Sequence, residues 1–294
     1  MSVLSGQLLL GLINGAFYAL LSLGLAIIFG LLRIINFAHG DIIMVGSYVA
    51  YVSLVMAGVP LWIAVLASIA FCAFVGIFIQ QVAYQRLLNS GAPRISLLIT
   101  AIGASIFLQN LFQMIFTSSG KSMPSMISGK PIVLGGLQIS NVTVVTIAVS
   151  VLLMAGLQLI VKKTRMGKAM RATSEDAGAA VLMGINTKRT IMFTFGLGSG
   201  LAAVGSVLYC SAYPLITPYM GGMLGLKAFV AAVLGGIGSI PGAMLGGYLI
   251  AISESLTKAF GLSKLTDAVV FGILILILLV RPAGLLGKNT KEKV

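Results

Sequence analysis

Long apolar blocks recur along the chain, and short polar segments separate them. Each block is continuously apolar and long enough to cross a hydrocarbon core about 30 Å thick as a helix. Continuous runs predict membrane helices, because the strands of a membrane barrel would alternate apolar and polar residues. The predicted spanning blocks are 7–32, 42–59, 61–84, 95–117, 140–161, 191–212, 223–257 and 266–280.

The seventh block, 223–257, is too long for one span. It contains four residues that disfavour the interior of a helix: Gly235, Gly236, Gly238 and Pro241. Because glycine and proline both weaken a helix, we predict two half-passes that meet within 234–247, as a helical hairpin or a re-entrant segment. The predicted fold class is therefore all-α, a polytopic transmembrane helical bundle of about eight to nine membrane segments.

A strongly basic interruption, 161–190, holds seven of the 19 Lys and Arg residues. Lysine and arginine are retained on the cytoplasmic side of a membrane, so we expect 162–190 to be a cytoplasmic loop and 281–294 a cytoplasmic tail. Both segments lie on one side only if the broken block crosses and returns. Counting back along the spans places Arg33 inside and the N-terminus outside.

Composition limits the chain to a single membrane domain. Hydrophobic residues make up 59% of the 294 residues and charged residues 9%, against about 25% charged in soluble proteins. The net charge of +13 comes from loops and the tail, which indicates topology and contact with anionic lipid rather than nucleic acid. Cys72 and Cys210 lie in apolar surroundings and are predicted to be packing residues.

The chain offers little for catalysis. It has one histidine, His39, so a multi-histidine metal site is impossible and no metal site is expected. It lacks the GxxxxGK[ST] loop that cradles phosphates, so we expect it to bind no nucleotide or other cofactor itself. A self-sufficient channel or secondary transporter would need its own coupling charges, and the candidate acids Asp41, Glu254 and Asp267 all lie near the ends of blocks.

Polar residues occur between two apolar runs in the segment RIINFAHGD, residues 33–41. Ionisable groups at membrane depth are costly and face a partner or a water-filled pathway. Asn36, His39, Gly40 and Asp41 are therefore candidates for a translocation pathway. The alternative is a short cytoplasmic turn in which Asp41 caps the next helix.

The predicted break at 234–247 is a second candidate for the pathway. Irregular backbone at membrane depth is tolerated where protein or a cavity satisfies its polar groups. One broken apolar segment in each half of a chain is a pointer to a transport path. A tight turn between two helices is the alternative.

Within the basic loop, MRATSEDAGAAVLMGIN can form a short helix. Thr173 or Ser174 can cap it, and Glu175 and Asp176 suit its first turn. Alanines give one face of the helix small side chains. Such a helix can dock into a groove on a soluble partner. A solvated connector is the alternative.

Four ordered motifs run through the chain: RIINFAHGD, RMGKAMRATSEDAGAAVLMGIN, KAFVAAVLGGIGSIPGAMLGG and VRPAGLLG. Together they resemble the permease subunits of branched-chain amino acid ABC importers, the LivH-type family, over essentially the whole chain. The resemblance implies that the loop contains the coupling helix, a divergent form of the EAA motif that rests on an ATPase. The residues it points to are Arg171, Ala172, Glu175, Asp176, Ala179 and Gly184.

The resemblance also implies partners and a location. The chain would be half of a heterodimeric pore in a bacterial inner membrane, beside a second related permease. Two cytoplasmic ATPase subunits would use the ATP, and an extracytoplasmic binding protein would deliver a branched-chain amino acid. Urea and short-chain amide permeases share this architecture and remain alternatives.

Overall fold

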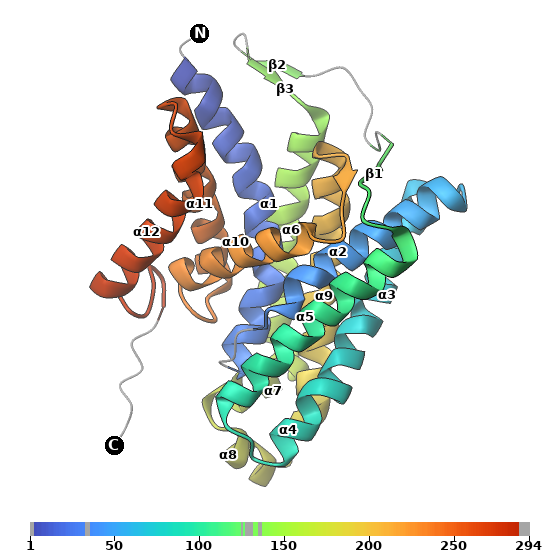
Figure 1. Ribbon diagram of the computed structural model, residues 1–294. Helices are drawn as coiled ribbons and strands as arrows, with labels where there is room; N and C mark the ends of the chain where they lie inside the picture. Colours follow the sequence, from blue (N-terminus) through green and yellow to red (C-terminus); the bar gives the residue numbers. More distant parts are fainter. Residues whose placement is uncertain (1–2, 33–35, 125, 127–131, 135–136, 288–294) are drawn as a thin grey trace.

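A computed structural model of the protein describes residues 3–32, 36–124, 126, 132–134 and 137–287 (Figure 1). These residues form helices, with two short β-ribbons at their connections. The longer helices are α1 (Val3–Leu32), α2 (Ala38–Tyr51), α3 (Leu61–Ile79), α5 (Arg94–Phe116), α6 (Asn141–Lys163), α9 (Thr187–Ala212), α10 (Met220–Gly235), α11 (Ile240–Ala259) and α12 (Thr266–Val280).

The remaining elements are short. They are the helices α4 (Gln85–Asn89), α7 (Arg165–Glu175) and α8 (Ala177–Leu182), the π-helical turns η1 (Val52–Met56) and η2 (Gln80–Tyr84), the 3-10 turn η3 (Ser263–Leu265), and the strands β1 (Lys121–Ser122), β2 (Ile132–Leu134), β3 (Leu137–Ile139) and β4 (Leu215–Ile216). Strand β1 pairs antiparallel with β4, Lys121 opposite Ile216, and β2 pairs antiparallel with β3.

The predicted spans are confirmed. Within the described residues, seven helical segments are long and apolar enough to cross a membrane, and the bent pair α10 and α11 brings the number to eight if it is counted as one span. The all-α polytopic bundle expected from the apolar blocks is therefore the observed fold class.

The block with the glycines and proline breaks where predicted, between Gly235 and Ile240, and the two helices are bent by 119°. Gly236 ends α10 with φ 118°, a conformation that side chains with a β-carbon rarely adopt. Ser239 caps α11, its hydroxyl accepting from the Gly242 amide at 3.2 Å. Pro241 lies in the first turn of α11, where its missing N–H costs nothing.

Helices α10 and α11, the bent pair, bring the chain back to the end of the bundle where α9 ends. Helix α9 ends at Ala212, and the hydroxyl of the next residue, Tyr213, donates to Asn14 Oδ1 in the first half of α1 at 2.6 Å. Helix α11 ends near the same place, because a β-carbon on Gly11 would lie 3.2 Å from the Ser255 side chain. The break lies toward the other end of α1, with Gly238 against Gly30. The segment is thus re-entrant, as the parity of the basic segments required.

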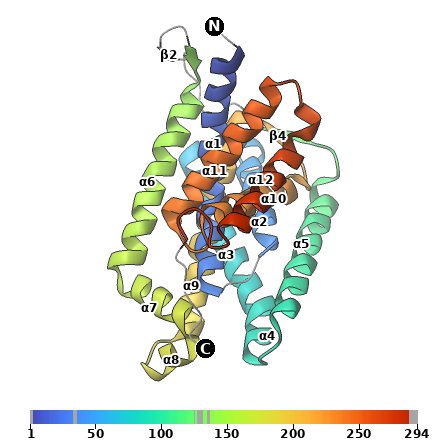
Figure 2. The same cartoon turned by 90° about the vertical axis from the view of Figure 1, so that its left-hand side faces the viewer.

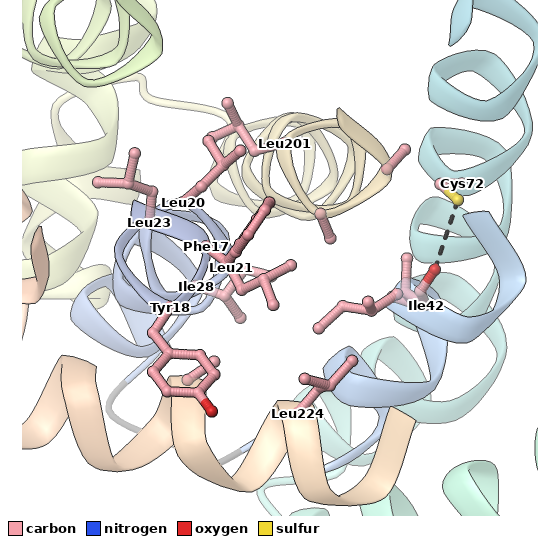
Figure 3. Close-up of a cluster of buried hydrophobic side chains, with 14 of the residues drawn as sticks. Phe17, Tyr18, Leu20, Leu21, Leu23, Ile28, Ile42, Cys72, Leu201 and Leu224 are labelled. Atoms are coloured by element: carbon pink, nitrogen blue, oxygen red, sulfur yellow. Dashed lines mark hydrogen bonds between the residues drawn. The ribbon is translucent and has the colours of Figure 1, made fainter. Parts of the chain in front are cut away.

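Helices α1, α2, α9, α10 and α11 form the centre of the bundle, and α3, α5, α6 and α12 surround them (Figures 1 and 2). The most apolar window of α1 is 89% buried, whereas that of the last span, residues 263–280, is 11% buried. Apolar side chains exposed on the outer helices suit a hydrocarbon solvent. Side chains that meet in the core include Phe17, Leu21, Ile42, Leu201 and Leu224 (Figure 3).

Candidate functional site

After α1 the chain turns back into the bundle instead of running along its surface. The His39 ring lies beside Gly24, where a β-carbon would sit 3.0 Å from His39 Nε2. Gly24 precedes the end of α1 by eight residues, or about 12 Å at the helical rise. Gly40 packs against the backbone of Gly221 and Gly225 in α10. The start of α2 therefore lies inside the bundle.

The polar residues of this segment are buried together. Asn36 is 2% exposed, and His39 and Asp41 are fully buried. Asp41 lies in the first turn of α2, but the cap residue is Phe37 and makes no side-chain cap bond. The alternative in which Asp41 caps the next helix is therefore wrong. Arg33 lies outside the described residues.

Neighbouring helices hold two of these polar side chains. Tyr84 in η2 donates its hydroxyl to Asn36 Oδ1 at 2.9 Å. Gln109 in α5 donates Nε2 to Asp41 Oδ1 at 2.9 Å and to Ser105 Oγ at 3.3 Å. Among the described residues, Asn36 Nδ2, both ring nitrogens of His39 and Asp41 Oδ2 have no hydrogen-bond partner. Buried polar groups normally have partners, so these mark a site with unused hydrogen-bonding capacity.

A cavity of about 340 Å³, which we call the central cavity, adjoins this cluster between α1, the segment just before α2, α5 and α10. Its polar wall is formed by Asn36, Ser105, Gln109 and Tyr219. Its apolar wall is formed by Leu25, Phe37, Met223, Leu226 and Phe229. His39 and Asp41 do not line this cavity, and Asp41 contacts its wall through Gln109.

The break borders a larger cavity of about 880 Å³, the inner cavity. Gly238 and Pro241 line it, together with the end of α1. Gly235 and Gly236 lie just behind, where α10 ends. The opposite wall is α7, which contributes Arg171 and Glu175 among others. The structure thus brings the break and the basic loop, which are far apart in the sequence, to one cavity.

The VRPAGLLG motif closes the break from its other side. The Leu285 amide donates to the Leu234 carbonyl at 3.0 Å, and the Leu286 amide donates to the Gly235 carbonyl at 2.9 Å. The last carbonyls of a helix have no partners within the helix. The segment 282–287 supplies them for α10 and also lines the inner cavity.

The basic loop forms two helices rather than one. Thr164 caps α7 by accepting from the Gly167 amide at 3.0 Å. Asp176 caps α8 by accepting from the Gly178 and Ala179 amides at 2.8 and 3.0 Å. The predicted cap at Thr173 or Ser174 was wrong, because α7 has already started at its own cap and both residues lie in its last turns.

The predicted loop residues therefore separate into two groups. Arg171, Ala172 and Glu175 belong to α7, and of these Arg171 and Glu175 face the inner cavity. Asp176, Ala179 and Gly184 belong to α8 and its end, where Gly184 closes the helix at φ 80°. The tip of the loop also exposes three large apolar side chains, Val181 at 55%, Leu182 at 89% and Met183 at 83%. Figure 2 shows α8 at the end of the bundle farthest from the N-terminus.

Sequence reasoning missed a partly buried ionic cluster. Lys227 in α10 pairs with Glu254 in α11 at 2.7 Å and with Asp267 in α12 at 3.3 Å. Tyr18 in α1 donates its hydroxyl to Glu254 Oε2 at 3.1 Å. The available signal was a lone lysine within an otherwise apolar block, since an ionisable residue in a membrane segment implies a partner.

A bundle of spanning helices that encloses a polar cluster, with a broken helix beside a cavity, is the architecture of a membrane transport protein. The family model described as branched-chain amino acid transport system / permease component matches residues 7–279. The chain belongs to this family.

Curated relatives agree over nearly the full length. The high-affinity branched-chain amino acid transport system permease protein BraD of Pseudomonas aeruginosa is 43% identical, with 98% of this chain and 97% of the relative covered. The corresponding protein LivH of Escherichia coli is 42% identical with the same coverage. A probable LivH of Methanocaldococcus jannaschii is 31% identical over 93% of this chain and 89% of its own. No solved structure matches the chain.

Proposed function

We propose that this permease forms half of the translocation pathway of an ABC importer for branched-chain amino acids. The observation that carries the proposal is the placement of the central and inner cavities one after the other along α10. Residues of α10 as far as Phe229 line the central cavity, and α10 ends at Gly235, just before Ile237 and Gly238 of the inner cavity. The six residues from Phe229 to Gly235 correspond to about 9 Å along the helix. A solute that passes from the polar cluster to the basic loop would follow α10.

The proposal includes further partners, and membership of the family supports them. A second related permease would complete the pore, two cytoplasmic ATPases would bind and hydrolyse ATP, and an extracytoplasmic binding protein would deliver the solute. The basic loop would be cytoplasmic, and the N-terminus would lie outside in a bacterial inner membrane.

The loop would couple the ATPase to the pathway through both of its helices. Helix α8 carries the exposed apolar tip, Val181, Leu182 and Met183, which suits a hydrophobic groove on an ATPase. Helix α7 then transmits movement of α8 to the inner cavity, which it lines through Arg171 and Glu175. An ATPase can bias the pore only by binding its two states with different affinity, so the tip must dock differently in each.

The central cavity favours a branched-chain amino acid over urea or a short amide. Its apolar wall, which includes Leu25, Met223 and Phe229, would face a solute side chain. Urea has no apolar part that would benefit from such a wall.

A charged residue introduced at the exposed tip of α8 tests the proposed coupling to the ATPase. In vesicles that contain the complete importer, Leu182→Glu should abolish most ATP-driven leucine uptake, while the chain still inserts. Leu262→Glu is the matched control, because Leu262 is 50% exposed at the opposite end of the bundle. Wild-type uptake by the Leu182→Glu complex would refute the docking role, and uptake by the purified chain without an ATPase would refute the importer.

A further inference from the structure

The polar wall of the central cavity includes two amide side chains, Asn36 from the segment just before α2 and Gln109 from α5. An amide carries a donor at one end and an acceptor at the other, so its neighbours decide which end a ligand meets. In both residues a hydrogen bond to a neighbour occupies one end.

The orientation of Gln109 follows from Asp41. A carboxylate can only accept hydrogen bonds, so the Gln109 group that faces Asp41 Oδ1 at 2.9 Å is the Nε2 donor. The same nitrogen also lies 3.3 Å from Ser105 Oγ. The amide oxygen, Oε1, is then the end that remains to accept a hydrogen bond.

The orientation of Asn36 is the opposite. Tyr84 donates its hydroxyl to Asn36 Oδ1, which leaves Nδ2 as the free end. That nitrogen has no partner among the described residues, although Asn36 is 98% removed from solvent and lines the cavity. A buried donor without a partner is unfavourable, so an acceptor supplied by a ligand would stabilise it.

The third feature is the apolar wall. Phe37, Met223, Leu226 and Phe229 lie around the cavity together with Leu25. The residues around the cavity therefore include an amide with an unpartnered donor, an amide with an unused acceptor oxygen, and an apolar surface. The volume of about 340 Å³ is in the size range of small-molecule sites.

We propose that the central cavity is a binding site for a free α-amino acid with a branched apolar side chain. Asn36 Nδ2 donates to the α-carboxylate, Gln109 Oε1 accepts from the α-ammonium group, and the apolar wall packs the side chain. The proposal rests on the proposed function and adds that the permease recognises its substrate itself, after the binding protein has released it.

The test measures binding of radiolabelled leucine to the permease and ATPase complex in nanodiscs, without any binding protein. Leucinamide, which lacks the carboxylate, and 4-methylpentanoate, which lacks the ammonium group, serve as competitors, and both should compete poorly. Asn36→Asp keeps an acceptor for Tyr84 and replaces the free donor by an acceptor. It should weaken leucine binding by about ten- to a hundredfold and leucinamide binding much less.

Two further variants make the result decisive. Asn110→Asp introduces the same chemical change at an exposed side chain of α5 and should leave leucine binding unchanged. Met223→Trp fills the cavity from its apolar wall and should weaken leucine binding as well. Unchanged leucine affinity in both Asn36→Asp and Met223→Trp, or no binding by a wild-type complex that transports leucine, would overturn this site while leaving the importer intact. Failure of ATP-driven uptake by the wild-type complex would instead refute the proposed function.

Discussion

Lys227 and Glu254 join the two halves of the broken segment through an ion pair of 2.7 Å. Lys227 lies on α10 and Glu254 on α11, and their side chains are 16% and 2% exposed. The pair therefore ties together two helices that are bent by 119°. Tyr18 attaches the same carboxylate to α1 and Asp267 attaches the same ammonium group to α12.

Removing one member of this pair should destabilise the bundle. Lys227→Met leaves Glu254 as a buried charge without its cation, and loss of one partner of a buried pair costs about 3–5 kcal/mol. The measurement is thermal unfolding of the purified chain in detergent. The double variant Lys227→Met, Glu254→Gln should recover part of the loss. Lys258→Met, at an exposed position of α11, is the control, and equal losses in both lysine variants would contradict a structural role for the pair.

A second prediction concerns the contact between Gly235 and Gly242 on either side of the break. A β-carbon at Gly242 would press on the carbonyl group of Gly235, which is backbone and cannot rotate away. Gly242→Ala should lower the free energy of unfolding by about 1–3 kcal/mol, the range for overpacking. Gly103→Ala in α5 has no atom within 4 Å of the new methyl group and should be neutral or stabilising by about 0.5–1 kcal/mol. A neutral Gly242→Ala would show that the break does not depend on this close approach.

Helix α8 should depend on its cap. Asp176→Ala removes the acceptor for the Gly178 and Ala179 amides, and loss of such a cap costs about 0.5–2 kcal/mol. Hydrogen exchange of residues 177–182 should speed up, and ATP hydrolysis should become less dependent on solute. Asp176→Asn retains an oxygen acceptor and should behave like the wild type. Protection that survives in Asp176→Ala would mean that packing, rather than the cap, holds α8.

The orientation of the bundle can be read by cysteine labelling. Cys72 and Cys210 are fully buried, so the wild-type background should react slowly with a membrane-impermeant maleimide. Leu182→Cys should label in spheroplasts only after permeabilisation, because the loop tip is expected on the cytoplasmic side. Phe260→Cys, which is 73% exposed at the other end of the bundle, should label without it. The reverse pattern would invert the topology.

The spans were predictable because their cause is local. A membrane helix satisfies its backbone internally and needs only about 20 apolar residues. The predicted block 95–117 corresponds to α5 and the block 266–280 to α12 within one residue at each end. The break was also predictable, because Gly236 and Pro241 disfavour a continuous helix whatever surrounds them.

The cap of the loop helix was not predictable in the same way. Thr164, Thr173, Ser174 and Asp176 are all good cap residues, and local sequence cannot choose among them. Packing of Met170 and Thr173 against the bundle buries one side of α7 and extends that helix past the expected start. Asp176 then becomes the cap of the next helix.

The apolar blocks and their glycines, read in order, were enough to establish a polytopic bundle with one re-entrant pair and a basic loop, because each of these features follows from how a short segment interacts with lipid or water. That Asn36 and Gln109 line one cavity, that Lys227 pairs with Glu254, and that the break and the basic loop border a second cavity required the folded chain. In each case the partners come from different segments of the chain, and side-chain hydrogen bonds and ion pairs form only within a few ångströms. Which residues come that close is set by helix packing, and the packing of small residues such as Gly40 against Gly225 has no signature strong enough to be read along a single sequence.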